Sequence, residues 1–203
     1  MARITKAPQE RRKEILDTAL ELFLKNGYEK TSVSDIVHKL NVAQGLFYYY
    51  FKSKEEVFRA ALEQYTDDFA AKLESIILDD SISFIKRIEY VLKTKDQLFH
   101  QSEEVLMEGI QHSEQLEMDY RLSIHVAQIL VGPVSEALSN ANEKGVISIK
   151  DTTATATFLV FGIFGLIHGN PEQLHNNQYL DPQDIIHLIS KVLGVTPEAL
   201  GQI

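Results

Sequence analysis

The residues best suited to forming hydrogen bonds with a ligand lie close together, in the run TSVSDIVHKLNVAQGLFYYYFKSK at positions 31–54. A glutamine amide, such as that of Gln44, matches the donor and acceptor on an adenine edge. Hydroxyl groups, such as those of Thr31 and Ser32, and the ammonium of Lys54 bind phosphate oxygens. This combination of side chains is therefore suited to binding a nucleic acid.

Two short helices are predicted to position these side chains. Ser32 can cap the first helix, because Asp35 follows it at the spacing of a capping box. Apolar residues recur through this helix at the spacing that gives it one apolar face. Asn41 tolerates the left-handed conformation with which a helix ends. The sequence therefore predicts a helix that stops at about residue 40 and a tight turn after it.

The second short helix is expected over residues 44–50. Phe47 and Phe51 are four residues apart and share one face of this helix, while Gln44 and Tyr48 point elsewhere. Ser53 and Glu56 then form the capping-box pattern of a following helix. Two short helices joined by a tight turn are typical of a helix-turn-helix, whose second helix enters the major groove of DNA.

The run from Ile15 to Phe58 resembles the DNA-binding domain of the TetR (tetracycline-repressor) family of bacterial regulators. The resemblance covers about a quarter of the chain, and it is specific because many positions agree at fixed spacing. The departures from the family pattern are Val37 for Ala, Asn41 for the turn glycine, Ala43 for Ser and Phe47 for Leu. Ala43 removes the usual cap of the second helix, a loss of about 1 kcal/mol.

The resemblance and the positions together imply a set of DNA contacts. Gln44 and Tyr48 are expected to contact base edges, and Leu46 to pack on a thymine methyl group. Thr31, Ser32, Tyr50 and Lys54 are expected to hold phosphates. The full set of predicted DNA-binding residues is Thr31, Ser32, Ser34, Gln44, Gly45, Leu46, Tyr48, Tyr49, Tyr50 and Lys54.

The charges divide unevenly along the chain. Residues 1–54 hold 10 of the 20 Lys and Arg residues but only 6 of the 29 Asp and Glu residues, which is a net charge of +4. Residues 55–203 then carry −13, and the whole chain −9. The basic excess lies where DNA binding is predicted, although an ordinary solvated surface is the alternative explanation.

Apolar periodicity predicts an all-α chain with about nine helices. We expect a three-helix helix-turn-helix domain over residues 1–54 and a helical ligand-binding and dimerisation domain over 55–203. Pro133 is expected to kink or split the helix that contains it. The predicted helices are 8–26, a short helix ending at 40, 44–50, 53–78, 82–99, 103–112, 115–143, 152–168 and 182–193, with one more turn near 196–200.

The family resemblance implies a regulatory pocket enclosed by the helices between residues 53 and 143. Each candidate residue has plain core packing as its alternative, and a solvent-facing pair is the favoured explanation for Glu108 and His112. We expect no metal and no cofactor. The predicted ligand-binding residues are Tyr65, Phe69, Phe99, His100, Met107, Glu108, His112, Tyr120, Ile124, His125 and Gln128.

The helix over 152–168 is apolar on all sides, which requires burial on all sides. A second copy of the chain would cover the outer side in a four-helix interface, and a buried central helix of a monomer is the alternative. The resemblance favours the homodimer, because the family dimerises through its last two helices. The predicted interface residues are Phe158, Phe161, Gly162, Gly165, Ile185 and Ile189.

Together with the family resemblance, these observations predict a ligand-responsive transcriptional regulator that binds a near-palindromic DNA operator as a dimer and is released by a small, largely apolar effector. We expect a repressor, because repression is the commoner outcome in the family. A transcriptional activator and a helical small-molecule-binding adaptor are the alternatives. The sequence contains no GxSxG, P-loop, HExxH or dinucleotide motif, so we expect no enzyme. It has no cysteine, no signal-peptide pattern and no apolar run of membrane length, which favours a cytoplasmic location without membrane contact.

Overall fold

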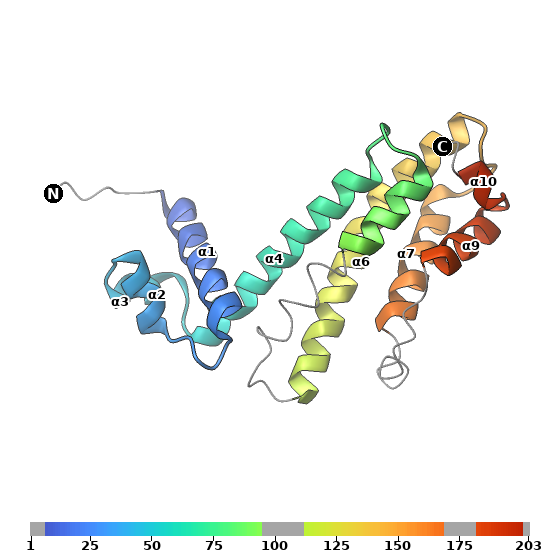
Figure 1. Cartoon of the computed structure of the whole chain (residues 1–203). Coiled ribbons are helices and arrows are strands. Elements are labelled where there is room, and N and C mark those ends of the chain that lie inside the picture. Colours follow the sequence, from blue (N-terminus) through green and yellow to red (C-terminus); the bar gives the residue numbers. More distant parts are fainter. Residues whose placement is uncertain (1–6, 95–111, 169–181, 201–203) are drawn as a thin grey trace. The chain divides into compact units, whose positions relative to one another are not determined.

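A computed structural model of the 203-residue chain describes residues 7–94, 112–168 and 182–200, and these are helical with short connections (Figure 1). No strand occurs in those ranges, which confirms the prediction of an all-α fold. The elements are α1 (Pro8–Asn26), α2 (Val33–Leu40), α3 (Gln44–Tyr50), α4 (Lys54–Ile77), helical residues 84–94, α6 (His112–Glu143), α7 (Thr152–His168), α9 (Pro182–Leu193) and α10 (Pro197–Leu200).

The described residues form two compact units. The first contains residues 7–66 and 112–116, and the second contains 67–94, 117–168 and 182–200. This division differs from the predicted boundary at residue 54, because the first three turns of α4 pack into the N-terminal core. There the Phe58 ring lies 4.9 Å from the ring of Phe23 and 4.6 Å from that of Tyr28.

Local signals explain where the short helices begin and end. Ser32 Oγ accepts a hydrogen bond from Asp35 N at 3.1 Å, and Ser32 N donates to Asp35 Oδ2 at 2.8 Å, so the predicted capping box is present. The hydrogen bonds from Ser32 lower the pKa of the Asp35 carboxyl below its ordinary value. Asn41 ends α2 in the left-handed conformation, with φ 54°.

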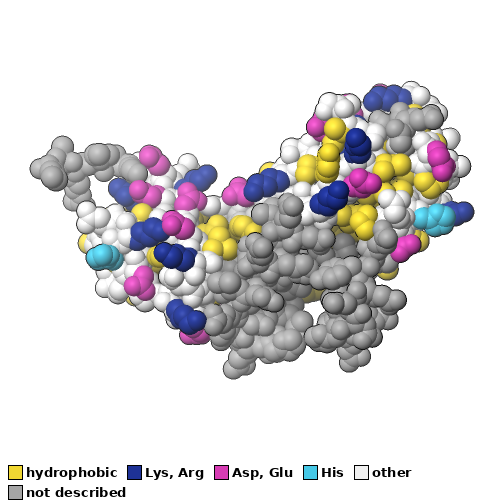
Figure 2. Space-filling model, viewed as in Figure 1, with side chains coloured by type: hydrophobic (Ala, Val, Ile, Leu, Met, Phe, Trp, Pro, Cys, Tyr) yellow, Lys and Arg dark blue, Asp and Glu magenta, His cyan; other side chains and the backbone are white. Residues whose placement is uncertain are grey.

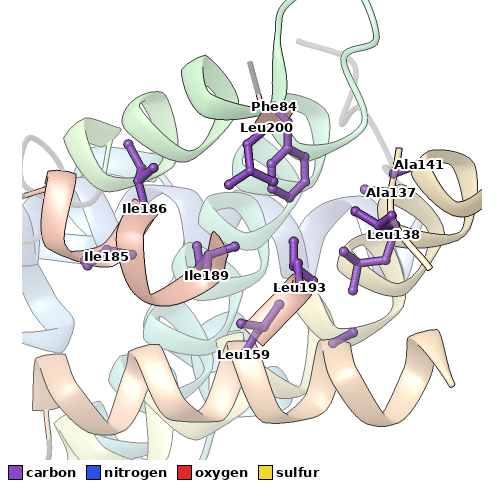
Figure 3. Close-up of a cluster of buried hydrophobic side chains, with 12 residues drawn as sticks. Phe84, Ala137, Leu138, Ala141, Leu159, Ile185, Ile186, Ile189, Leu193 and Leu200 are labelled. Atoms are coloured by element: carbon purple, nitrogen blue, oxygen red, sulfur yellow. The ribbon is translucent and has the colours of Figure 1, made fainter. Parts of the chain in front are cut away.

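Each unit has its own apolar core. In the first unit the buried residues include Ile15, Phe23, Ile36, Phe47 and Phe58. In the second unit, apolar side chains from α6, α7, α9 and α10 meet in one cluster (Figure 3). The labelled members of this cluster are Phe84, Ala137, Leu138, Ala141, Leu159, Ile185, Ile186, Ile189, Leu193 and Leu200.

Arg87 closes the C-terminal end of α4. Arg87 is 4% exposed, and its guanidinium donates to Ile77 O at 3.1 Å, to Ile82 O at 3.0 Å and to Asp80 Oδ1 at 2.8 Å. Ile77 is the last residue of α4, and its carbonyl would have no partner within the helix. The Arg87 guanidinium supplies the missing donor. The buried charge is paired and hydrogen-bonded, as burial requires.

Most predicted helices agree closely with the observed ones. The ranges of α1, α3, α7 and α9 are those predicted, and α4 begins and ends within one residue of its prediction. Pro133 does not split its helix, because α6 continues from His112 to Glu143 through that residue. The predicted helix over 103–112 lies outside the described residues except for its last residue, which begins α6.

Candidate nucleic-acid interface

The exposed face of α3 carries the predicted base-reading residues. Gln44 is exposed, and the side chains of Tyr48 and Tyr49 are 51% and 76% exposed. Phe47 and Phe51 are buried on the opposite face and anchor α3 to the first core. The short helix therefore presents one amide and two phenol groups to an outside partner, and such groups match base edges and phosphates.

Gly45 has no steric reason within the protein to be a glycine. It is exposed, and a Cβ atom built on it would meet nothing within 4 Å. Glycine in a helix is about 1 kcal/mol less favourable than alanine. Its place beside Gln44 on the exposed face suits a partner whose surface approaches the helix backbone closely.

Thr31 does not fit its predicted role as a phosphate contact. The side chain is 1% exposed, and its hydroxyl donates to Gly27 O at 2.9 Å, with Leu22 O a further acceptor at 3.2 Å. The hydroxyl therefore fixes the turn between α1 and α2, and we replace the predicted contact with this positioning role. Ser32 and Ser34 are exposed, although the Ser32 hydroxyl already takes part in the capping box.

Lys54 has two partners within the first unit. Its Nζ donates to Glu29 O at 3.3 Å and lies 4.1 Å from the centre of the Tyr28 ring. These contacts tie the first residue of α4 to the loop before α2. Ser53 caps the same helix end, since Glu56 N donates to Ser53 Oγ at 3.1 Å. Any phosphate contact of Lys54 would add to this structural role.

The two remaining predicted contacts on α3 are half-buried. Leu46 and Tyr50 are intermediate in exposure, and the rings of Tyr49 and Tyr50 meet edge to face with centres 4.9 Å apart. This ring pair supports the C-terminal half of α3, so Tyr50 positions Tyr49 as well as offering its own hydroxyl.

Several basic residues of the first unit are already paired with carboxylates. Arg11 pairs with Glu14, Lys39 with Glu21 on α1, and Arg59 with Glu55. Figure 2 shows lysine and arginine side chains interspersed with carboxylates over this unit. The positive charge available to a partner is therefore smaller than the residue count suggests.

The described part of the second unit brings one predicted ligand-binding residue into polar contact. His125 Nε2 on α6 lies 2.8 Å from Asp67 Oδ1 on α4. Phe69 is buried, Ile124 is half-buried, and Tyr120 and Gln128 are exposed. Tyr65 is half-buried and falls in the first unit. Phe99, His100, Met107 and Glu108 lie outside the described residues, as does the side chain of His112.

Ser123 on α6 is a polar residue that the sequence reasoning missed. Its side chain is 3% exposed, and its hydroxyl has no hydrogen-bond partner among the residues that the structure describes. It shares a stripe of α6 with the buried Val126, Ala127 and Leu130. A serine at the i, i+3, i+4, i+7 spacing of an apolar face is the signal that would have identified it.

The residues predicted for the dimer face differ in exposure between α7 and α9. Phe158 is 66% exposed, and a Cβ atom on Gly162 or Gly165 would meet nothing within 4 Å. Phe161 is half-buried. On α9, however, Ile185 and Ile189 are buried in the core of their own unit, so they do not fit the predicted interface. The exposed apolar residues of that helix are Leu188 and Val192.

The described ranges contain no group of three or more His, Cys, Asp or Glu side chains that could hold a metal ion. The segment Tyr120–Glu143 of α6 has the length and apolar composition of a membrane span. Leu130, Ala137 and Leu138 of this segment are buried within the protein, and the core helix of a soluble protein can have the same length and composition.

The N-terminal unit is similar in sequence to known bacterial regulators. Residues 15–61 match the family of bacterial regulatory proteins, tetR family. The HTH-type transcriptional repressor ComR of Escherichia coli (strain K12) is 45% identical over 60 residues, which are 30% of this chain and 29% of that protein. The fatty acid metabolism regulator protein of Bacillus subtilis (strain 168) is 34% identical over 64 residues, 32% and 33% of the two chains.

The likeness beyond the N-terminal region is one of fold. The crystal structure of a transcriptional regulator from Cytophaga hutchinsonii ATCC 33406 superposes with a TM-score of 0.60 at 19% identity. That match covers 95% of this chain and 98% of the other. In contrast, this chain spans about a third of the length of the curated relatives it matches.

Proposed function

We propose that this chain, which belongs through residues 15–61 to the tetR family of bacterial regulatory proteins, is a ligand-responsive transcriptional repressor. The observation that carries the proposal is the geometry of α3. Its apolar residue Phe47 is buried in the first core, so that Gln44, Tyr48 and Tyr49 face outward together. A helix anchored in this way can enter the major groove without losing its support.

The proposed contacts follow from exposure and chemistry. Gln44 and Tyr48 read base edges, Leu46 meets a thymine methyl group, and Gly45 lets the helix backbone approach the DNA. Ser32, Ser34, Tyr49, Tyr50 and Lys54 hold phosphates.

Binding to double-stranded DNA tests the proposal directly. The purified chain is titrated against labelled duplexes from the region upstream of its own gene, and against scrambled duplexes of the same composition. We expect tighter binding to an upstream duplex, and affinity for both kinds of duplex that falls with added salt. Equal affinity for the scrambled and upstream sequences across the whole region would reject a sequence-reading role for α3.

The direction of regulation is repression. Its support is the similarity of the N-terminal region to a protein named as a transcriptional repressor. A reporter gene behind the bound upstream region tests the sign. Deleting the regulator should raise reporter expression, whereas a fall in expression would make the protein an activator.

We further propose a homodimer formed through α7 and α9. Phe158, Leu166, Leu188 and Val192 are large apolar side chains that these two helices leave exposed, and a second copy of the chain that covered them would remove this apolar area from water. A two-fold dimer would supply two copies of α3 for two half-sites. Phe158→Glu should produce monomers in sedimentation velocity. Thr157→Glu changes the neighbouring exposed position and is the matched control.

Regulation by a small, largely apolar molecule is proposed for the second unit. The buried hydroxyl of Ser123 offers such a molecule a polar partner within an apolar stripe of α6. Because α4 runs from the first unit into the second, a ligand that prefers one arrangement of α4 would change DNA affinity. A coupling of about 1–3 kcal/mol, or roughly 5–150-fold, is typical. A compound that binds the second unit but leaves DNA affinity unchanged would reject the coupling.

We propose that the protein acts in the cytoplasm without catalysis, cofactor or membrane contact. The relatives of the chain are named as regulators, which supports a non-enzymatic role. Incubation of the chain with bound compounds, followed by mass spectrometry, would reveal turnover if the second unit were an enzyme.

A further inference from the structure

We propose that Arg12 binds a DNA phosphate beside the recognition helix, an inference that rests on the DNA binding proposed above. The Arg12 guanidinium carbon lies 5.0 Å from the centre of the Phe51 ring. Phe51 is buried and directly follows Tyr50, the last residue of α3. Arg12 itself is exposed. The ring therefore holds an exposed positive charge from α1 against the end of α3.

The charge of Arg12 remains available to a partner. Its neighbour Arg11 pairs with Glu14 at 2.5 Å, and Lys39 pairs with Glu21. In the part of the chain that the structure describes, no carboxylate lies within salt-bridge distance of Arg12. An aromatic ring attracts a cation without neutralising it. Arg12 can thus offer a full positive charge to an anion outside the protein.

The chemistry of the guanidinium points to phosphate. It carries five N–H donors in one plane and no acceptor, a geometry that matches two phosphate oxygens at once. When a helix occupies the major groove, the residues that flank it meet the sugar-phosphate strands at the groove edges. Phe51 already restricts the side chain of Arg12, so less conformational entropy is lost when a phosphate binds.

Two substitutions separate charge from packing. Arg12→Met keeps a flexible apolar chain beside Phe51 but removes the charge. Arg12→Lys keeps the charge but not the planar set of donors. Each variant of the full chain is titrated by fluorescence anisotropy against an upstream duplex and a scrambled duplex, between about 50 and 200 mM salt.

We expect Arg12→Met to weaken binding to both duplexes by about tenfold at the lower salt concentration, because phosphate contacts carry no sequence information. The slope of log affinity against log salt concentration should become shallower by about 0.9 for each protomer bound. Arg12→Lys should restore the slope and only part of the affinity. Lys25→Met, about 20 Å further along α1, is the matched control and should keep most of the wild-type slope.

Unchanged affinity in Arg12→Met would overturn the inference. So would a loss of affinity with an unchanged salt slope, because that result would show that Arg12 only supports the position of α3. If the wild-type chain bound neither duplex, the proposed function itself would be overturned, and this inference with it. Thermal unfolding of each variant shows whether the first unit remains folded during these measurements.

Discussion

The two units differ in what they leave exposed. In the first unit, Phe23, Phe47 and Phe58 are buried, and the large exposed side chains of α3 are the phenol groups of Tyr48 and Tyr49. In the second unit, α7 leaves Phe158 and Leu166 exposed. The exposed face of α3 suits a polar partner that binds reversibly from water. The exposed apolar side chains of α7 suit an apolar partner that stays bound. The DNA contacts and the chain association proposed above therefore fall in different units.

The largest expected effect tests whether the first half of α4 belongs to the first unit. Phe58→Ala removes a buried ring that packs on Phe23 and Tyr28, and should destabilise that unit by about 3–5 kcal/mol. Amide hydrogen exchange should become faster in α1 to α3 and stay unchanged in α7 and α9. Arg59→Ala, at the adjacent exposed position, is the control. Equal acceleration in both units would mean that they unfold together.

The second prediction concerns sequence reading by α3. Gln44→Ala should cost about 1–3 kcal/mol of DNA affinity at a single base position, because one amide pairs with one base edge. Titration against duplexes with each base pair changed in turn measures this effect. A loss of equal size on every duplex would assign Gln44 to the phosphate backbone and leave base reading to Tyr48.

The third prediction concerns the stability cost of the buried Ser123 hydroxyl in the second unit. Ser123→Ala removes a buried hydroxyl without a partner among the described residues, and should raise the free energy of unfolding by about 1 kcal/mol. Ser135→Ala on the same helix is the control. Its hydroxyl lies 3.0 Å from Thr153 Oγ1, so its loss should lower stability. Urea denaturation measures both variants, and a destabilised Ser123→Ala variant would mean that the hydroxyl has a structural partner.

Gly45→Ala should separate folding from binding in the first unit. Alanine favours the helix by about 0.5–1 kcal/mol, and its Cβ meets nothing within 4 Å, so thermal stability should rise. DNA affinity should fall in the same variant if the DNA surface approaches the α3 backbone closely. Higher stability with full DNA affinity would show that this close approach does not occur.

The helices could be predicted from the sequence because their ends depend on neighbouring residues. The Ser32–Asp35 capping box and the left-handed Asn41 are local signals, and both are present in the structure. The role of Thr31 depends on the carbonyl of Leu22, nine residues earlier, for which the sequence carries no local mark. The role of such a residue can be assigned only when the three-dimensional path of the chain is known.

The dimer face shows a second limit of sequence reasoning. Apolar residues occupy α9 at positions 185, 186, 188, 189 and 192, so their spacing does not distinguish the inner side from the outer side. The fold makes that choice, because α7 and α10 pack against the side that carries Ile185 and Ile189. The same argument applies to the boundary between the units, which depends on the contacts of Phe58 and not on a break in α4.

The smallest expected effect is a pH dependence confined to the first unit. The hydrogen bonds from Ser32 hold the pKa of Asp35 below its ordinary value of 3.8 in the folded chain. The carboxylate therefore contributes stability that is fully present above about pH 4 and is lost as the pH falls through the lowered folded pKa.

Urea midpoints of the wild-type chain and Asp35→Asn should differ at neutral pH and converge in acid. Ser32→Ala should remove most of the same difference, since it deletes the hydroxyl that lowers this pKa. A difference that persists unchanged at pH values well below 3.8 would show that the Asp35 carboxylate does not stabilise α2 through its charge.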